Sequence, residues 1–69
     1  MNSEARGLFD RIVKEIDTMI DNGHTRLITY WPQPTELALE QCILALWDDG
    51  YWVEHKKLNG RVYFKIEWN

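Results

Sequence analysis

The side chains that could do chemistry are few and lie far apart in the sequence. His24 and His55 are the two imidazole bases, Cys42 is the one thiol, and Asp48-Asp49 is the one pair of adjacent carboxylates. Nucleophilic catalysis needs a hydroxyl or thiol within reach of a base that a third group orients, and no spacing here provides it. Adjacent carboxylates on a helix do not face each other, and a cysteine among apolar helix positions is expected to be a buried hydrophobe. The sequence has no phosphate-binding loop, metal-ligand cluster or nucleophile elbow, so it predicts a protein that is not an enzyme and has no cofactor or metal.

Length and charge exclude further classes. Sixty-nine residues make one domain, over residues 1–69. Eight Lys and Arg against eleven Asp and Glu give a net charge of −3. This charge argues against the binding of duplex DNA, because such binding needs a dense basic patch. The longest apolar run, Cys42–Trp47, is far short of the roughly 20 residues of a membrane span. Residues 1–6 contain no apolar signal core, and one cysteine cannot form an internal disulfide, so we expect a cytoplasmic protein that does not bind membranes.

An amphipathic helix is predicted over residues 4–21. Ser3 is a suitable N-cap, and Asn22-Gly23 provides the left-handed residue that ends many helices. The apolar positions recur at helical spacing and leave one polar face. They are Ala5, Leu8, Phe9, Ile12, Val13, Ile16, Met19 and Ile20.

A strand is predicted over residues 25–31, which are rich in β-branched and aromatic side chains. Pro32 ends it, because proline cannot donate to a sheet. Both sides of the strand are apolar, with Ile28 and Tyr30 on one side and Leu27, Thr29 and Trp31 on the other. Such a strand is either covered twice or has a contact surface on one side.

A second helix is predicted over residues 34–49, with Pro34 in its first turn and Gly50 after its end. Its main apolar face carries Ala38, Leu39, Cys42, Ile43, Ala45 and Leu46. Leu37 and Leu44 lie near the opposite side, and Trp47 flanks the main face. A helix that is apolar nearly all round is buried on more than one side. Either this chain or another chain therefore covers Leu37 and Leu44, and with Trp47 they form the candidate oligomer or partner face.

The last segment is predicted to be a β-hairpin of strands 51–58 and 61–68. Asn59-Gly60 between alternating runs is the signal of a two-residue type I′ turn, which fixes the register. The core face of the hairpin carries Tyr51, Val53, Val62, Phe64, Ile66 and Trp68. The other face carries Trp52, Glu54, Lys56, Leu58, Arg61, Tyr63, Lys65 and Glu67.

These elements predict an α+β fold with the order α-β-α-β-β. We expect a small two-layer sandwich, with two helices on one face of a three-stranded sheet and the other face open. The first strand is parallel to its neighbour if it adjoins the first hairpin strand and antiparallel if it adjoins the last, and the sequence leaves this open. A winged-helix domain used for protein contact is an alternative architecture, because residues 46–51 precede a hairpin.

The open hairpin face is the main candidate site, and its residues are Trp52, Lys56, Arg61, Tyr63 and Lys65. Trp52 and Tyr63 are interpreted as diagonal neighbours among cations. This composition suits a hot spot for a protein partner. The alternative is a platform for a nucleotide or a single-stranded nucleic acid. A surface without a ligand, stabilised by Lys56 over Tyr63 and by a Glu54–Lys65 ion pair, would look the same.

One family resemblance adds to these expectations. A leading amphipathic helix, a short strand, a helix ending in Gly50-Tyr51 with Val53 after it, and a closing Ile66-Glu67-Trp68 resemble small tailed-bacteriophage proteins. The resemblance covers most of the chain as a pattern of a few residues. It implies an accessory protein of the host cytoplasm that inhibits or adapts host or defence machinery, and it transfers no catalytic or ligand residue.

Overall fold

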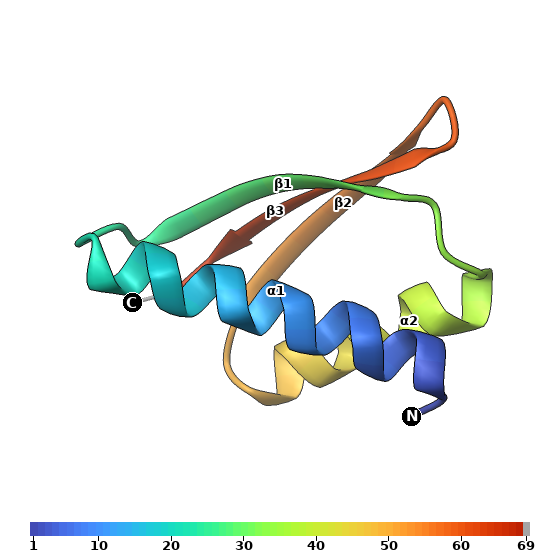
Figure 1. Ribbon diagram of the computed structural model, residues 1–69, viewed down its shortest axis with the longest axis horizontal. Helices are drawn as coiled ribbons and strands as arrows, with labels where there is room; N and C mark the ends of the chain where they lie inside the picture. The colour runs from blue at the N-terminus through green and yellow to red at the C-terminus, as the bar shows by residue number, and fades with distance from the viewer. Residues whose placement is uncertain (69) are drawn as a thin grey trace.

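The computed structural model describes residues 1–68 and has the predicted order of elements (Figure 1). Helix α1 spans Ser3–Asp21, strand β1 Arg26–Pro32, helix α2 Glu36–Asp48, strand β2 Trp52–Leu58 and strand β3 Arg61–Glu67. Every element begins and ends within two residues of its predicted bounds. The α+β fold class is therefore confirmed.

The sheet has the strand order β1-β3-β2, and both pairings are antiparallel. The last strand is thus central, which decides between the two arrangements that the sequence left open. Both helices lie on the same side of the sheet, and the opposite side carries no helix (Figure 1). Residues 22–35, between the two helices, contain β1 and no further helix. The winged-helix alternative is therefore wrong, because that fold needs another helix there.

The hairpin turn fixes the register of β2 against β3. Asn59 and Gly60 have φ angles of 47° and 80°, as a type I′ turn requires at both central positions. The pairing runs from Leu58 opposite Arg61 to Trp52 opposite Glu67, as predicted.

Both helices end in the same way. Gly23 and Gly50 have positive φ angles of 80° and 91°. The amide of the next residue then bonds back to the last turn: His24 N donates to Met19 O at 2.9 Å, and Tyr51 N donates to Leu46 O at 3.1 Å. These are Schellman motifs, in which glycine takes the left-handed position without steric cost.

The helix beginnings differ from the prediction by one or two residues. Asn2, and not Ser3, caps α1, because its side-chain oxygen accepts the amide of Ala5 at 2.7 Å. Helix α2 begins after Thr35, whose hydroxyl accepts the amide of Ala38 at 3.3 Å. Pro34 therefore precedes the cap and does not lie in the first turn.

The core lies between the two layers. Its buried members come from all five elements: Ile12, Ile16, Leu27, Leu39, Cys42, Ile43, Leu46, Val53, Val62, Phe64 and Ile66. The accessible surface is 4671 Å², close to the value of about 4,600 Å² expected for a compact chain of this mass. Exposed apolar side chains are therefore not the result of loose packing.

Candidate interaction surfaces

Among the described residues, no helix lies on the side of the sheet away from α1 and α2 (Figure 1), which we call the open sheet face. The register places outward-facing residues of all three strands in four cross-strand rows. The rows are Arg26-Glu67-Trp52, Ile28-Lys65-Glu54, Tyr30-Tyr63-Lys56 and Pro32-Arg61-Leu58. All five residues of the predicted hairpin site lie on this face.

The aromatic side chains of the open sheet face are arranged differently from the prediction. Tyr63 pairs with Tyr30 of β1, with ring centroids 5.4 Å apart and planes tilted by 56°. Trp52 is 62% exposed, and its Nε1 donates to Glu54 at 3.2 Å. Trp52 and Tyr63 are not diagonal neighbours, because the Glu54–Lys65 row separates theirs. Four residues along a strand are about 13 Å, so one small ligand could not contact both rings.

The open sheet face is positively charged. Its four cations, Arg26, Lys56, Arg61 and Lys65, and its two carboxylates, Glu54 and Glu67, sum to +2 on a chain whose net charge is −3. Lys65 lies opposite Glu54 in the ladder, but its ion pair is with Glu67, at 3.8 Å. The predicted Glu54–Lys65 ion pair is therefore wrong, since the Glu54 carboxylate accepts the Trp52 indole instead.

Strand β1 contributes residues that the sequence-based site did not include. Ile28 and Tyr30 are exposed on the open sheet face, beside Arg26. The alternation of β1 had placed Ile28 and Tyr30 on one side of their strand. Ile28 and Tyr30 extend the outward face of the hairpin only because β1 adjoins β3, and nothing in the sequence specifies that strand order.

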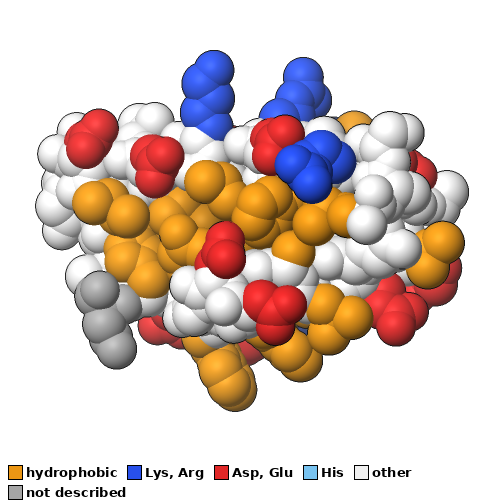
Figure 2. Space-filling model, turned by 90° about the horizontal axis from the view of Figure 1, so that it is seen from below, with side chains coloured by type: hydrophobic (Ala, Val, Ile, Leu, Met, Phe, Trp, Pro, Cys, Tyr) orange, Lys and Arg blue, Asp and Glu red, His pale blue; other side chains and the backbone are white. Residues whose placement is uncertain are grey.

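A second surface lies along α2. Leu37 and Leu44 are 57% and 48% exposed, and Trp47 is also exposed. The described part of the chain does not cover these three side chains. The alternative that another element of this chain buries Leu37 and Leu44 is therefore wrong. Hydrophobic side chains also gather on the helix side of the molecule, between acidic ones (Figure 2).

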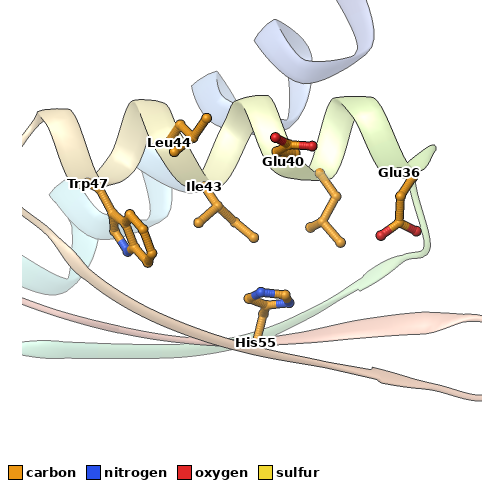
Figure 3. Close-up of a pocket in the computed structure, with 7 residues that line it drawn as sticks. Glu36, Glu40, Ile43, Leu44, Trp47 and His55 are labelled. Atoms are coloured by element: carbon orange, nitrogen blue, oxygen red, sulfur yellow. The ribbon is translucent and has the colours of Figure 1, made fainter.

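A groove of about 300 Å³ separates α2 from β2. His55 points from β2 toward the helix, opposite Ile43 and Trp47 (Figure 3). The other lining residues are Glu36, Leu39, Glu40 and Leu44. The groove exists because β2 leaves the core early: only Val53 of this strand is buried. Lys57 crosses the end of the groove to form an ion pair with Glu36.

The residues considered for catalysis are not brought together. His24 is exposed between α1 and β1, and Asp48 and Asp49 are exposed at the end of α2. Cys42 is fully buried, and burial raises the pKa of its thiol to about 11, which keeps it protonated at neutral pH. No group of three metal-ligating side chains occurs among residues 1–68.

Trp31 lies on the helix side of the sheet and is half-buried. The guanidinium of Arg11 lies 5.5 Å from the centre of its ring, within cation–π range. The structure therefore gives Trp31 a packing role between β1 and α1, in contrast to the exposed Trp52.

The chain matches no protein-family model, no curated protein and no solved structure. Within residues 1–68, neither helix is long and apolar enough to cross a membrane.

Proposed function

We propose that this chain is a small protein-interaction module that binds its partner through the open sheet face. The observation that carries the proposal is a whole sheet face left uncovered in an otherwise compact domain. Ile28, Tyr30, Trp52 and Leu58 are all exposed there. Ile28 and Tyr30 are successive outward residues of β1, and Tyr63 packs against Tyr30. Neighbouring exposed apolar side chains of this kind mark a binding surface on a small protein.

The composition of the face supports a protein partner. Tryptophan, tyrosine and arginine dominate binding hot spots, where apolar anchors are surrounded by polar groups. Here Trp52, Tyr30 and Tyr63 lie on the same face as the cations Arg61, Lys56 and Lys65. The net +2 of the face favours a partner whose docking surface is acidic, because complementary potentials speed association and exclude wrong partners.

The resemblance to small tailed-phage proteins supplies the class of partner. On that basis we propose a host or defence protein as the target and modulation of its activity as the outcome. This second step rests on the sequence pattern alone, whereas the first rests on the exposed face.

The experiment is a comparative capture from host cell extract with three baits. They are the wild type, a Tyr30→Ala/Trp52→Ala variant of the open sheet face, and a Leu37→Ser/Leu44→Ser variant of the helix side. A protein retained by the wild type and the helix variant, but lost from the sheet variant, supports the proposal. Its binding is then measured with both components purified. Retention of the same proteins by all three baits would refute it.

The Tyr30–Tyr63 pair favours a second candidate, a single-stranded nucleic-acid platform. Two adjacent rings on a sheet can stack on bases while Lys56, Arg61 and Lys65 neutralise phosphates. Such binding should weaken steeply as salt rises. Titration with a labelled oligonucleotide at low salt tests it, and unchanged anisotropy up to high protein concentration rejects it.

A further inference from the structure

We propose that two copies of this chain form a symmetric dimer by pairing their β2 strands antiparallel about His55. The two sheets would then join into one sheet of six strands. This inference concerns the free edge of β2. The side chains that it pairs, Trp52, Glu54, Lys56 and Leu58, also lie on the open sheet face. The hydrogen exchange of the β2 backbone tests the dimer separately from the capture of a partner.

The first step is that the outer edge of β2 has unpaired backbone groups. Hydrogen bonds at the two ends of β3 show which of its backbone groups face β1. Gln33 N donates to Gly60 O at 2.9 Å, just before β3, and Trp68 N donates to Thr25 O at 3.1 Å, just after it. Even-numbered residues along β3 thus direct their backbone groups to β1, and odd-numbered ones direct theirs to β2.

The register then identifies the free groups. The odd-numbered residues of β3 pair with Trp52, Glu54, Lys56 and Leu58. The amides and carbonyls that point away from the sheet belong to Val53, His55 and Lys57, which we call the edge amides. No turn, loop or cap hydrogen bond among residues 1–68 reaches them. An edge strand of this kind is a template for another strand.

The opposite edge of the sheet is less suitable. By the same alternation, the outward groups of β1 belong to Arg26, Ile28, Tyr30 and Pro32. Pro32 has no amide hydrogen to donate, which is a common protection of edge strands. Strand β2 contains no proline and no residue with a positive φ angle.

Charge complementarity selects both the partner and the register. With the edge amides paired about His55, Glu54 lies opposite the partner's Lys56, and Lys56 lies opposite the partner's Glu54. Trp52 lies opposite the partner's Leu58, and these two exposed apolar side chains would cover each other. Opposite charges and apolar side chains are the favourable cross-strand pairs. Each of these side-chain pairs occurs twice, as a two-fold interface requires, and His55 lies on the axis opposite the partner's His55.

The neighbouring registers are unfavourable. A shift of the symmetry axis by one residue toward the start of β2 places Glu54 opposite the partner's Glu54. A shift by one residue the other way places Lys56 opposite the partner's Lys56. Like charges directly opposite each other are destabilising, and both shifts leave one of the three edge amides without a partner. The sequence of β2 is therefore self-complementary in one register.

The same arrangement accounts for the uncovered face of α2. The symmetry axis is perpendicular to the sheet, so both α2 helices stay on the same side of it. Strand β2 rises away from α2 toward the hairpin turn (Figure 1). The two-fold axis turns the partner's α2 antiparallel to this one, so its Trp47 end lies toward the hairpin end of this chain's β2. A second copy of the chain would thus pair with the free edge of β2 and approach the groove that Leu44, Trp47 and His55 line.

Amide hydrogen exchange as a function of protein concentration tests the edge. If β2 pairs with a second copy, the amides of Val53, His55 and Lys57 gain protection as the concentration rises from micromolar to millimolar. The amides of Glu54 and Lys56 are the internal control, because they bond to β3 in either state. Gain of protection at Ile28 and Tyr30 instead would assign dimerisation to β1 and overturn the proposal.

A charge-swap series tests the register by sedimentation equilibrium. Lys56→Glu and Glu54→Lys each turn two attractive pairs into repulsive ones, so each is expected to weaken dimerisation about tenfold or more. The double variant Glu54→Lys/Lys56→Glu restores opposite charges and should recover most of the loss. Lys14→Glu, on the exposed face of α1, changes the net charge as Lys56→Glu does and should leave dimerisation unchanged.

Two results overturn the proposal. One is a species of 8.3 kDa, the mass of a single chain, at every concentration up to millimolar. The other is a dimer whose dissociation constant is the same in both single variants. Circular dichroism melting of each variant at low concentration separates these outcomes from failure to fold.

Discussion

The carboxylate of Glu4, in the first turn of α1, accepts two hydrogen bonds from Thr35, the N-cap of α2. The Thr35 amide donates at 3.1 Å and its hydroxyl at 2.8 Å. The hydroxyl oxygen in turn accepts the amide of Ala38. A residue 31 positions away thus determines where α2 begins and ties the starts of the two helices together.

The Glu4→Ala variant should therefore be less stable to unfolding than the wild type, although the Glu4 side chain is exposed. Hydrogen bonds to a charged group contribute more than neutral ones, and solvent screening reduces that contribution at the surface. We expect a loss of about 1 kcal/mol, or roughly 4–8 °C in the melting temperature of a domain of this size. Thermal melting by circular dichroism measures it. Asp10→Ala is the control, because Asp10 is an exposed α1 carboxylate without an ion pair among the described residues, and an equal loss there would contradict the assignment.

The same contact shows where the sequence could predict the structure and where it could not. The ends of α1 and α2 were predictable, because Gly23 and Gly50 act within their own turn. The hairpin register was predictable for the same reason, since Asn59-Gly60 determines it locally. The start of α2 was not, because Pro34 is acceptable in a first turn and Thr35 is acceptable as an N-cap. The structure decides for Thr35, whose hydroxyl accepts the amide of Ala38 and donates to Glu4.

The candidate site follows the same division. The alternation of each strand correctly separated the outward side chains from the core. The strand order, which the sequence left open, places Tyr30 beside Tyr63. The separation of Trp52 from Tyr63 follows from the predicted hairpin register itself, so the expectation that these two rings are diagonal neighbours is inconsistent with that register. The exposure of Leu37 and Leu44 was also undetermined, because it depends on whether a further element of the chain packs on that side of α2.

Burial of Cys42 makes the stability of the domain fall at alkaline pH. Its thiol pKa rises from an ordinary value of 9.0 to about 11 in the folded state. The unfolded chain therefore loses this proton first, and the contribution to stability is complete below pH 9 and lost as the pH rises toward 11. Burial, Asp17 and Asp49 raise the pKa of Tyr51 as well, which acts in the same direction.

The Cys42→Ala variant distinguishes the contribution of the Cys42 thiol to the alkaline loss of stability from that of Tyr51. At pH 7 the variant should be about 1 kcal/mol less stable, because it leaves a small cavity. Between pH 9 and pH 11 the difference from the wild type should shrink, as the wild type loses the Cys42 contribution and the variant keeps only that of Tyr51. Urea unfolding at several pH values measures this. A constant difference across that range would show that Cys42 does not titrate differently on folding.

Trp52→Ala should affect binding without affecting the fold. The indole is mostly exposed and its hydrogen bond is to the exposed Glu54, so the stability should change by no more than about 0.5 kcal/mol. As the most exposed large aromatic of the open sheet face, Trp52 should contribute at least tenfold to partner affinity. Calorimetry with the purified partner measures the affinity, and loss of cooperative melting would place Trp52 in the core instead.

The double variant Leu37→Glu/Leu44→Glu tests what the exposed side of α2 does. Leucine and glutamate have similar helix propensities, and both leucines are about half exposed, so the free energy of unfolding of the monomer should change little. A charge on this face should oppose any association that buries it, because an unpaired charge is costly to desolvate. We expect at least a tenfold weaker dimer by sedimentation equilibrium, with the melting temperature at low concentration nearly unchanged.

The matched Leu37→Gln/Leu44→Gln variant removes the same apolar surface without adding charge, and should weaken the dimer less. Dimerisation of equal strength in the wild type and both variants would mean that the partner does not approach this side of α2, and would restrict the interface to the β2 edge.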